Sequence, residues 1–100
     1  MFNNCNSILE LNLSNFVTTN VTDMSHMFNN CNALKTVNLS SFDTSKVTDM
    51  LYLFNNCNDL TEIDLTNFNT TNINNMQYMF NNCNYIKKIN RFLFITIKFT

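Results

Sequence analysis

The stretch Phe28-Asn29-Asn30-Cys31-Asn32 decides the fold, because the chain contains it four times at a constant spacing of 26 residues. The copies occupy residues 2–6, 28–32, 54–58 and 80–84. A constant period of this kind is typical of proteins built from stacked repeats, in which each repeat buries its apolar side chains against its neighbours. The sequence therefore predicts a single repeat array over residues 1–100, with units at 1–26, 27–52 and 53–78 and a degenerate unit at 79–100.

The two ends of the chain differ from the end units of a complete array. Met1 falls on the first position of a repeat, with no capping segment before it, and Arg91 replaces the leucine found at this position in the first three units. Repeat stacks normally need polar caps for solubility. We therefore expect this chain to be a fragment of a longer array.

Each unit divides into two parts with different apolar periods. Val37 and Leu39 are two residues apart, as are Leu11 and Leu13, which indicates a strand with one apolar face. In the second part Met24, Met27, Phe28 and Cys31 recur at i, i+3, i+4 and i+7, a spacing that favours a short helix, and Thr22, Thr48 and Asn74 are suitable N-caps. The predicted fold class is α/β, a leucine-rich-repeat-like solenoid with one short parallel β-strand and one short helix per 26-residue coil.

The composition limits the function. The formal net charge is −1, so the chain has no basic surface for nucleic acid. It contains no Gly and no Pro, and we expect the abundant Asn to form the turns instead. Asn-rich composition is also found in disordered tracts, but the strict apolar period argues against disorder. The apolar run at residues 92–99 is too short for a transmembrane helix, so we predict no direct membrane insertion.

One unit carries the pattern MFxxCxxLxxLxLSxFxTSxVTxM over residues 27–50. This pattern resembles the BspA-type leucine-rich repeat, also described as the mycoplasma family DUF285, and the resemblance covers about residues 1 to 90. The resemblance implies a surface-exposed or lipid-anchored protein of a low-GC bacterium, located at the cell surface or outside the cell. It also implies adhesion or host interaction, with no enzymatic activity and no cofactor. The Asn richness, Arg91 and the apolar tail depart from the family pattern.

The cysteines and asparagines form columns with one member per unit. Zinc sites use closely spaced pairs such as CxxC, and no such pair is present, so we expect no metal ligands. We interpret the cysteines as a buried thiol ladder, with a disulfide between neighbouring units left open, and the asparagines as side-chain amides that bond along the stack. The predicted structural ladders are Cys5, Cys31, Cys57 and Cys83, and Asn3, Asn29, Asn55 and Asn81.

The polar positions within the predicted strands are the candidate interaction face, because they vary between units while the apolar positions do not. They are Glu10, Asn12, Lys35, Thr36, Asn38, Thr61, Glu62, Asp64, Lys87 and Lys88. A further column, Thr18, Thr44 and Thr70, is typical both of flat ice-binding surfaces and of stacked hydroxyl-bonded turns. No Ser/His/Asp set and no carboxylate pair recurs, so we predict no catalytic residues.

Two hypotheses of function follow. In the first, the chain is a non-enzymatic segment of a bacterial surface protein that mediates protein–protein or host and matrix adhesion through its strand face. Its partner is an unknown protein or cell-surface macromolecule, not nucleic acid. In the second, the chain is a structural spacer or a variable antigenic array with no specific ligand.

Overall fold

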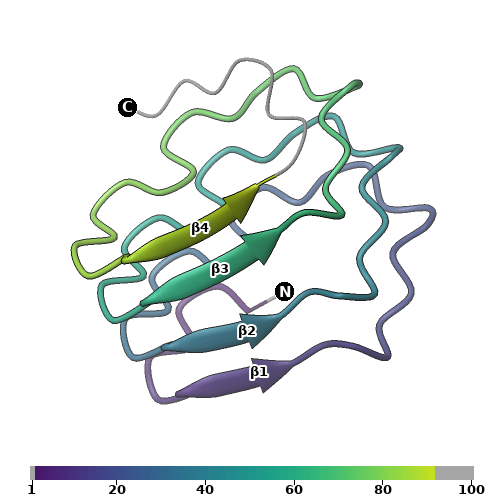
Figure 1. Cartoon of the computed structure of the whole chain (residues 1–100). Helices are drawn as coiled ribbons and strands as arrows, with labels where there is room; N and C mark the ends of the chain where they lie inside the picture. The colour runs from purple at the N-terminus through teal and green to yellow at the C-terminus, as the bar shows by residue number, and fades with distance from the viewer. Residues whose placement is uncertain (1, 92–100) are drawn as a thin grey trace.

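The computed structural model describes residues 2–91, in which four short strands lie side by side and point the same way (Figure 1). The strands are β1 (Glu10–Asn12), β2 (Thr36–Asn38), β3 (Glu62–Leu65) and β4 (Lys88–Arg91). They form two parallel two-stranded sheets, β1–β2 and β3–β4. A backbone bond of 3.3 Å from Thr61 N–H to the Lys35 carbonyl joins the segments just before β3 and β2.

The register of the strands shows that consecutive units stack in parallel. Leu11 pairs with Val37 in the first sheet, and Ile63 pairs with Ile89 in the second. Both offsets equal the 26-residue period of the sequence. Each strand therefore lies beside the equivalent strand of the next unit, and the repeat spacing sets the pairing directly.

The predicted helix is wrong. No helix is present within residues 2–91, and the segments from 25 to 30 and from 51 to 56 consist of consecutive tight turns. The expectation of an α/β leucine-rich-repeat-like solenoid with a helix in every coil is therefore not met. The units instead combine one short strand with turns and irregular backbone.

The backbone conformation of two residues per unit explains why no helix forms. His26 and Asn30 have φ values of 62° and 61°, in the left-handed region. A right-handed helix cannot continue through such a residue, so each one ends the helical run after a few positions. Asn and His are among the residues that enter this region most readily, whereas a bulky residue does so only at a cost. Equivalent left-handed residues recur at Asn4, Tyr52, Asn56, Tyr78 and Asn82.

The amide groups of this turn segment bond in two alternating ways. The N–H groups of Met24, His26 and Phe28 each donate to a carbonyl of the following unit, at Asp49, Leu51 and Leu53, with N to O distances of 2.9 Å. The N–H of Asn29, the residue after Phe28, instead donates to the His26 carbonyl at 3.1 Å and closes a tight turn. In a helix the donors beyond the first turn would be used within the segment. Here about half of them connect one unit to the next.

The apolar period nevertheless identified the buried positions. Met24, Met27, Phe28 and Cys31 all lie in the core, with 8 % or less of their surface exposed. The turns bring the same side chains inward that a helix would have placed on one face. At the centre of the core, the rings of Phe2, Phe28, Phe54 and Phe80 form a column with centroids 5.7, 5.1 and 5.3 Å apart and planes within 5° of parallel.

We expect Phe42→Ala to lower the free energy of unfolding by about 3–5 kcal/mol, because it opens a cavity in the core. Phe16→Ala at the same position of the first unit should cost clearly less, since Phe16 is 36 % exposed and Phe42 only 3 %. Urea denaturation of the two variants and the parent chain measures both values. Equal losses would contradict the view that a neighbouring unit, and not the unit itself, supplies the burial.

Candidate functional site

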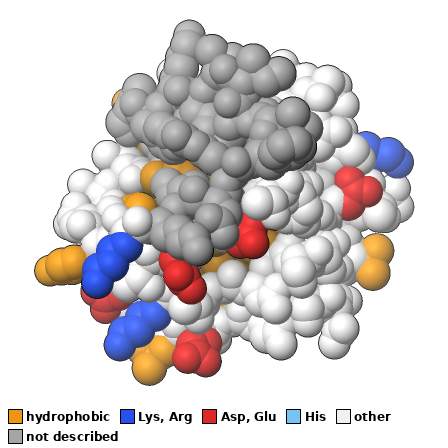
Figure 2. Space-filling model, in the orientation of Figure 1, with side chains coloured by type: hydrophobic (Ala, Val, Ile, Leu, Met, Phe, Trp, Pro, Cys, Tyr) orange, Lys and Arg blue, Asp and Glu red, His pale blue; other side chains and the backbone are white. Residues whose placement is uncertain are grey.

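The candidate interaction face is an exposed strip that crosses the strands. Glu10, Glu62 and Lys87 are exposed, whereas Leu11 and Ile63 pack against the core. Five of the remaining predicted positions are also exposed, namely Asn12, Lys35, Thr36, Asn38 and Asp64. Thr61 is half-buried. Figure 2 shows acidic and basic side chains intermixed on this side of the molecule. The structure therefore brings the predicted positions from Glu10 to Lys87 into one continuous strip of mixed charge, while the Lys88 side chain lies outside the described part of the molecule.

Backbone pairing fixes the order of positions along this strip. Glu10 lies opposite Thr36, and Glu62 lies opposite Lys88 of β4 in the backbone ladder. In the neighbouring column, Lys35 N–H donates to the Leu9 carbonyl at 2.8 Å and Lys87 N–H donates to the Thr61 carbonyl at 2.7 Å. Equivalent positions of successive units are therefore held at the spacing of paired strands, about 4.8 Å.

Three of the predicted positions serve the local fold. The Oδ1 atoms of Asn12, Asn38 and Asp64 accept hydrogen bonds from the backbone N–H groups two residues later, at 3.1, 2.9 and 2.9 Å. Such Asx turns use a side-chain oxygen to end a strand and start a bend. The amide and carboxylate oxygens that sequence reasoning assigned to a partner are thus engaged in turns at the ends of the strands.

Asx turns also hold two carboxylates in their charged form. Asp23 and Asp43 accept from the backbone N–H groups of Ser25 and Ser45, at 2.8 and 2.9 Å. Hydrogen bonds from the Ser25 and Ser45 side chains, followed by those from their backbones, hold the pKa values of Asp23 and Asp43 below the usual range. Both carboxylates are therefore suited to accepting hydrogen bonds and not to proton transfer near neutral pH.

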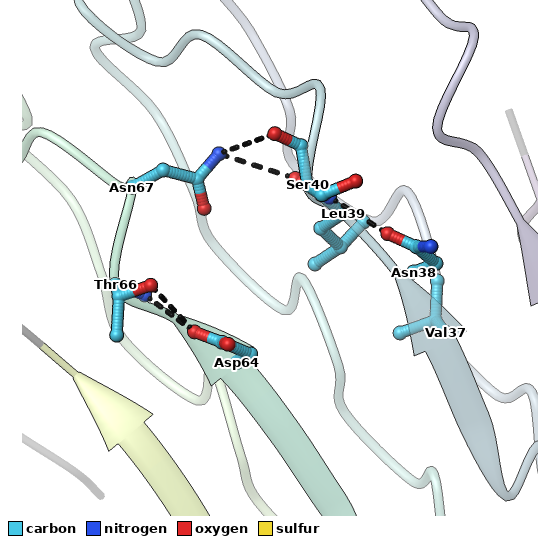
Figure 3. A pocket seen from close by; sticks show the side chains of 7 residues that line it. All are labelled: Val37, Asn38, Leu39, Ser40, Asp64, Thr66 and Asn67. Carbon is cyan, nitrogen blue, oxygen red and sulfur yellow. Dashed lines mark hydrogen bonds between the residues drawn. The ribbon is translucent and has the colours of Figure 1, made fainter.

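A cavity of about 340 Å³ opens beyond the ends of β2 and β3 (Figure 3). Its polar groups bond to one another or to the backbone. Thr66 Oγ donates to Asp64 Oδ1 at 2.7 Å, and Asn67 Nδ2 donates to the Leu39 and Phe42 carbonyls at 3.2 and 2.7 Å. Sequence reasoning missed this cavity. The available signal was the polar column Asn15, Ser41 and Asn67, whose last two members donate to the preceding unit.

The cysteines are free thiols, one in each unit. The Sγ atoms of Cys31, Cys57 and Cys83 each donate to a phenylalanine carbonyl of the preceding unit, at 2.9, 3.1 and 3.0 Å. Burial raises the pKa of Cys31 and Cys57, and it raises that of Cys83 to about 11. Because the thiolate is the reactive form, these side chains are poor nucleophiles.

Two asparagine columns bond along the stack. In the predicted column, Nδ2 of Asn29 donates to Asn3 Oδ1 at 3.1 Å, and Nδ2 of Asn55 donates to Asn29 Oδ1 at 3.0 Å. Asn55 Oδ1 is buried without a hydrogen-bond partner. The adjacent column continues further, through Asn4, Asn30, Asn56 and Asn82, with Nδ2 to Oδ1 distances of 2.8, 2.6 and 2.7 Å. Apart from Asn55 Oδ1, the amides named here are therefore occupied by one another.

An aromatic column occupies the left-handed positions of the turns. The ring of His26 lies 5.0 Å from that of Tyr52, which lies 5.0 Å from that of Tyr78. The two tyrosine planes are 10° from parallel. The His26 and Tyr52 planes are tilted by 41°, so only the two tyrosines stack face to face. The sequence analysis did not identify this column.

Two members of the threonine column, Thr18 and Thr44, are buried and do not form an exposed surface. Thr18 and Thr44 are 4 % and 1 % exposed, and their Oγ1 atoms donate to the carbonyls of Asp43 and Asn69 at 3.0 Å. An exposed ladder of hydroxyl groups for ice binding is therefore not formed by these two residues. They are buried hydroxyl groups that link neighbouring turns, the second interpretation of the sequence pattern.

Within residues 2–91, no three His, Cys, Asp or Glu side chains lie close enough to hold a metal ion. In the same part of the chain, no helix has the length and apolar character needed to cross a membrane.

Comparison with known proteins identifies the family to which the chain belongs. The family model described as "Mycoplasma protein of unknown function, DUF285" matches residues 1–96. The chain therefore belongs to the DUF285 family, as the repeat pattern indicated. No curated protein and no solved structure matches the chain.

We expect the chain to lose stability as the pH rises above the ordinary thiol pKa of about 8.5. The folded protein keeps its buried thiols protonated, and the pKa of Cys83 reaches about 11. The unfolded chain releases those protons earlier, so the folded state is fully favoured below the ordinary pKa and loses free energy through the folded-state pKa. Urea denaturation across this pH range measures the slope.

Two core variants separate the thiol effect from a general loss of packing. Cys57→Ala removes one fully buried thiol, so its unfolding free energy should fall less steeply with pH. Val47→Ala removes non-titrating atoms from the same core and should lower stability equally at every pH. Parallel curves for the parent chain and Cys57→Ala would show that the buried thiols do not cause the slope.

Proposed function

We propose that this chain is a binding segment of a bacterial surface protein, which attaches to another protein or cell-surface macromolecule through the exposed strand face. In this proposal it acts by adhesion and not by catalysis, and it needs no cofactor. The location at the cell surface rests on the resemblance to BspA-type repeats. The strand face consists of the positions in and beside the strands that point away from the core.

The observation that supports this proposal is the contrast between the two sides of each strand. The inward positions are Leu11, Val37 and Ile63, which are all aliphatic and pack against the core. The exposed positions directly before them are Glu10, Thr36 and Glu62, which differ in charge and size. A constant frame that carries variable exposed residues is the usual arrangement of a repeat protein that recognises a partner.

The mixture of charges favours a protein as the partner. Lys35 and Lys87 stand in one column of the strip, and Glu10 and Glu62 stand in the adjacent column. A partner would need charges of both signs in matching places, which gives specificity and orientation more than raw affinity. Nucleic acid presents negative charge alone and would be repelled by the glutamates.

One observation favours the second hypothesis, a structural spacer or variable antigenic array without a specific ligand. The Asn12, Asn38 and Asp64 side chains accept hydrogen bonds from the backbone at the strand ends. These three positions therefore serve the fold whether or not a partner exists. The binding proposal rests on the charged positions beside them, and the following experiment separates the two hypotheses.

We expect the labelled chain to bind to an immobilised panel of animal extracellular-matrix proteins, with weaker binding as salt increases. The triple variant Lys35→Ala, Glu62→Ala and Lys87→Ala should lower affinity by about tenfold or more, because a few central side chains carry most interface energy. Lys46→Ala is the matched control, since Lys46 is exposed but its Nζ bonds to Asn20 Oδ1 in a turn outside the strip. Surface plasmon resonance measures the affinities.

Three results would contradict this function. The first is no binding to any protein of the panel. The second is equal loss of affinity in the triple variant and in Lys46→Ala, which would indicate a nonspecific charge effect. The third is an unchanged affinity in the triple variant, which would support a spacer whose exposed residues are not used.

A further inference from the structure

The asparagine amides of this chain are of two kinds. One kind is used within the stack, as in the ladder where Nδ2 of Asn30 donates to Asn4 Oδ1 at 2.8 Å. The other kind is exposed at Asn12, Asn38 and Asn69, and within residues 2–91 only the Oδ1 atom of each of these amides forms a hydrogen bond. Their nitrogen atoms are therefore open to a reagent from solution.

The same three asparagines each begin an Asn-x-Ser or Asn-x-Thr triplet. The triplets are Asn12-Leu13-Ser14, Asn38-Leu39-Ser40 and Asn69-Thr70-Thr71. An asparagine followed two residues later by serine or threonine is the acceptor triplet for N-linked glycans. A further triplet is Asn20-Val21-Thr22. In a chain so rich in Asn, Ser and Thr the triplet alone is a weak signal, so the local geometry has to select among the four.

An Asx turn distinguishes the first three triplets from the one at Asn20. The backbone N–H of the third residue donates to Oδ1 of the asparagine, at 3.1 Å in the triplet of Asn12 and at 2.9 Å in those of Asn38 and Asn69. This bond fixes the amide relative to the serine or threonine, so the acceptor nitrogen and the hydroxyl group belong to one ordered bend. Asn20 forms no such turn within the described residues, and its Oδ1 accepts from Lys46 Nζ at 3.2 Å.

The bend at Asn38 shows how the acceptor is presented (Figure 3). Its Oδ1 is bonded to the backbone of Ser40, while Nδ2 lies on the other side of the amide and bonds to none of the residues drawn. Asn38 and Ser40 are both exposed, whereas Leu39 between them is only 3 % exposed and holds the bend against the core. The nitrogen can therefore be reached without local unfolding.

The third unit forms the same bend without the acceptor nitrogen. Asp64 stands at the position of Asn38, and its Oδ1 accepts from the Thr66 N–H at 2.9 Å. Thr66 supplies a hydroxyl group at the third position, but a carboxylate has no nitrogen to modify. This unit is therefore a natural control in which one functional group alone is missing.

We propose that Asn12, Asn38 and Asn69 are acceptor sites for an N-linked sugar. A bond forms between Nδ2 and the anomeric carbon C1 of a sugar that is activated by a diphosphate group. The bond from C1 to the diphosphate oxygen breaks, and the diphosphate leaves with the electron pair. A base of the transferase takes one proton from Nδ2, so the product is a neutral N-glycosyl amide. Nucleoside diphosphate sugars and polyprenyl diphosphate oligosaccharides share this chemistry.

This modification does not rest on the proposed adhesion function, because a transferase requires only the exposed bends. Asn12 and Asn38 end β1 and β2, so a sugar on either residue stands at the border of the charged strip. Sugar transfer and attachment to matrix proteins are measured by different readouts. The failure of one proposal therefore leaves the other intact.

The test incubates the folded chain with two purified transferase systems, each first shown to modify a short peptide that contains Asn38-Leu39-Ser40. One is a soluble N-glycosyltransferase with a uridine diphosphate hexose, and the other is a membrane oligosaccharyltransferase with a polyprenyl diphosphate oligosaccharide. Mass spectrometry of proteolytic fragments locates the sugar. We expect it on Asn12, Asn38 and Asn69 in at least one reaction, which identifies the donor, and not on Asn20.

Three variants test the geometry. Ser40→Ala removes the hydroxyl group but keeps the backbone N–H of the turn, so transfer to Asn38 should slow by about tenfold or more, as expected for the loss of one hydrogen-bonding group. Ser40→Thr keeps the hydroxyl group and should keep the site. Asp64→Asn supplies the missing nitrogen in unit three and should add one modified position. Circular dichroism confirms that each variant remains folded.

Three results would overturn the proposal. Transfer to the short peptide but not to the folded chain would show that the bends do not act as acceptors. Equal transfer to Asn20 would show that the Asx turn does not define the sites. Equal rates for the parent chain and Ser40→Ala would show that transfer to Asn38 does not use the triplet.

Discussion

The hydrogen bonds from the turn segments to the following unit are the interaction on which the rest of the structure depends. Met24, His26 and Phe28 donate their amides across the interface and not along their own segment. A segment bonded in this way is satisfied only when the next unit lies in register beside it. A single unit on its own would therefore leave some of its backbone N–H groups without hydrogen-bond acceptors. Stability thus depends on the contacts between neighbouring units.

The columns of side chains follow from this register. Once equivalent backbones are fixed at a constant spacing, equivalent side chains must also lie next to one another, whatever their chemistry. Phenylalanines then stack in the core, cysteines donate to carbonyls, and asparagine amides bond to one another. Asparagine suits this arrangement particularly well, because its amide both donates and accepts and because it tolerates the left-handed backbone of Asn30 and Asn56.

Much of this structure could be predicted from the sequence, because the period and the apolar positions are direct consequences of packing. The strands near Leu11, Val37 and Ile63 and the buried side chains of the turn segment followed from spacing alone. The helix was wrong because residues at i, i+3, i+4 and i+7 can also be buried by consecutive turns. Only the left-handed conformations distinguish the two, and Tyr52 gives no sign of one in its side chain.

The strip of candidate binding positions could be predicted for a similar reason, since alternation along a strand determines which side chains are exposed. The Asx turns of Asn38 and Asp64 could not be separated from binding roles, because the same oxygen serves either purpose. The cavity beyond β2 and β3 also escaped prediction. It is formed by residues from two units, and its shape depends on how their bends approach each other.

The cross-unit bonds of the turn segments have a direction. From Met24 to Asn30, and again from Met50 to Asn56, the donated N–H groups point toward the following unit and the accepting carbonyls face the preceding one. Since each peptide group is a dipole, groups aligned in this way add together along the stack. The amides of Thr48 and Asn74 donate to the preceding unit instead, so the opposing dipoles lie side by side and the alignment is confined to the turn segments.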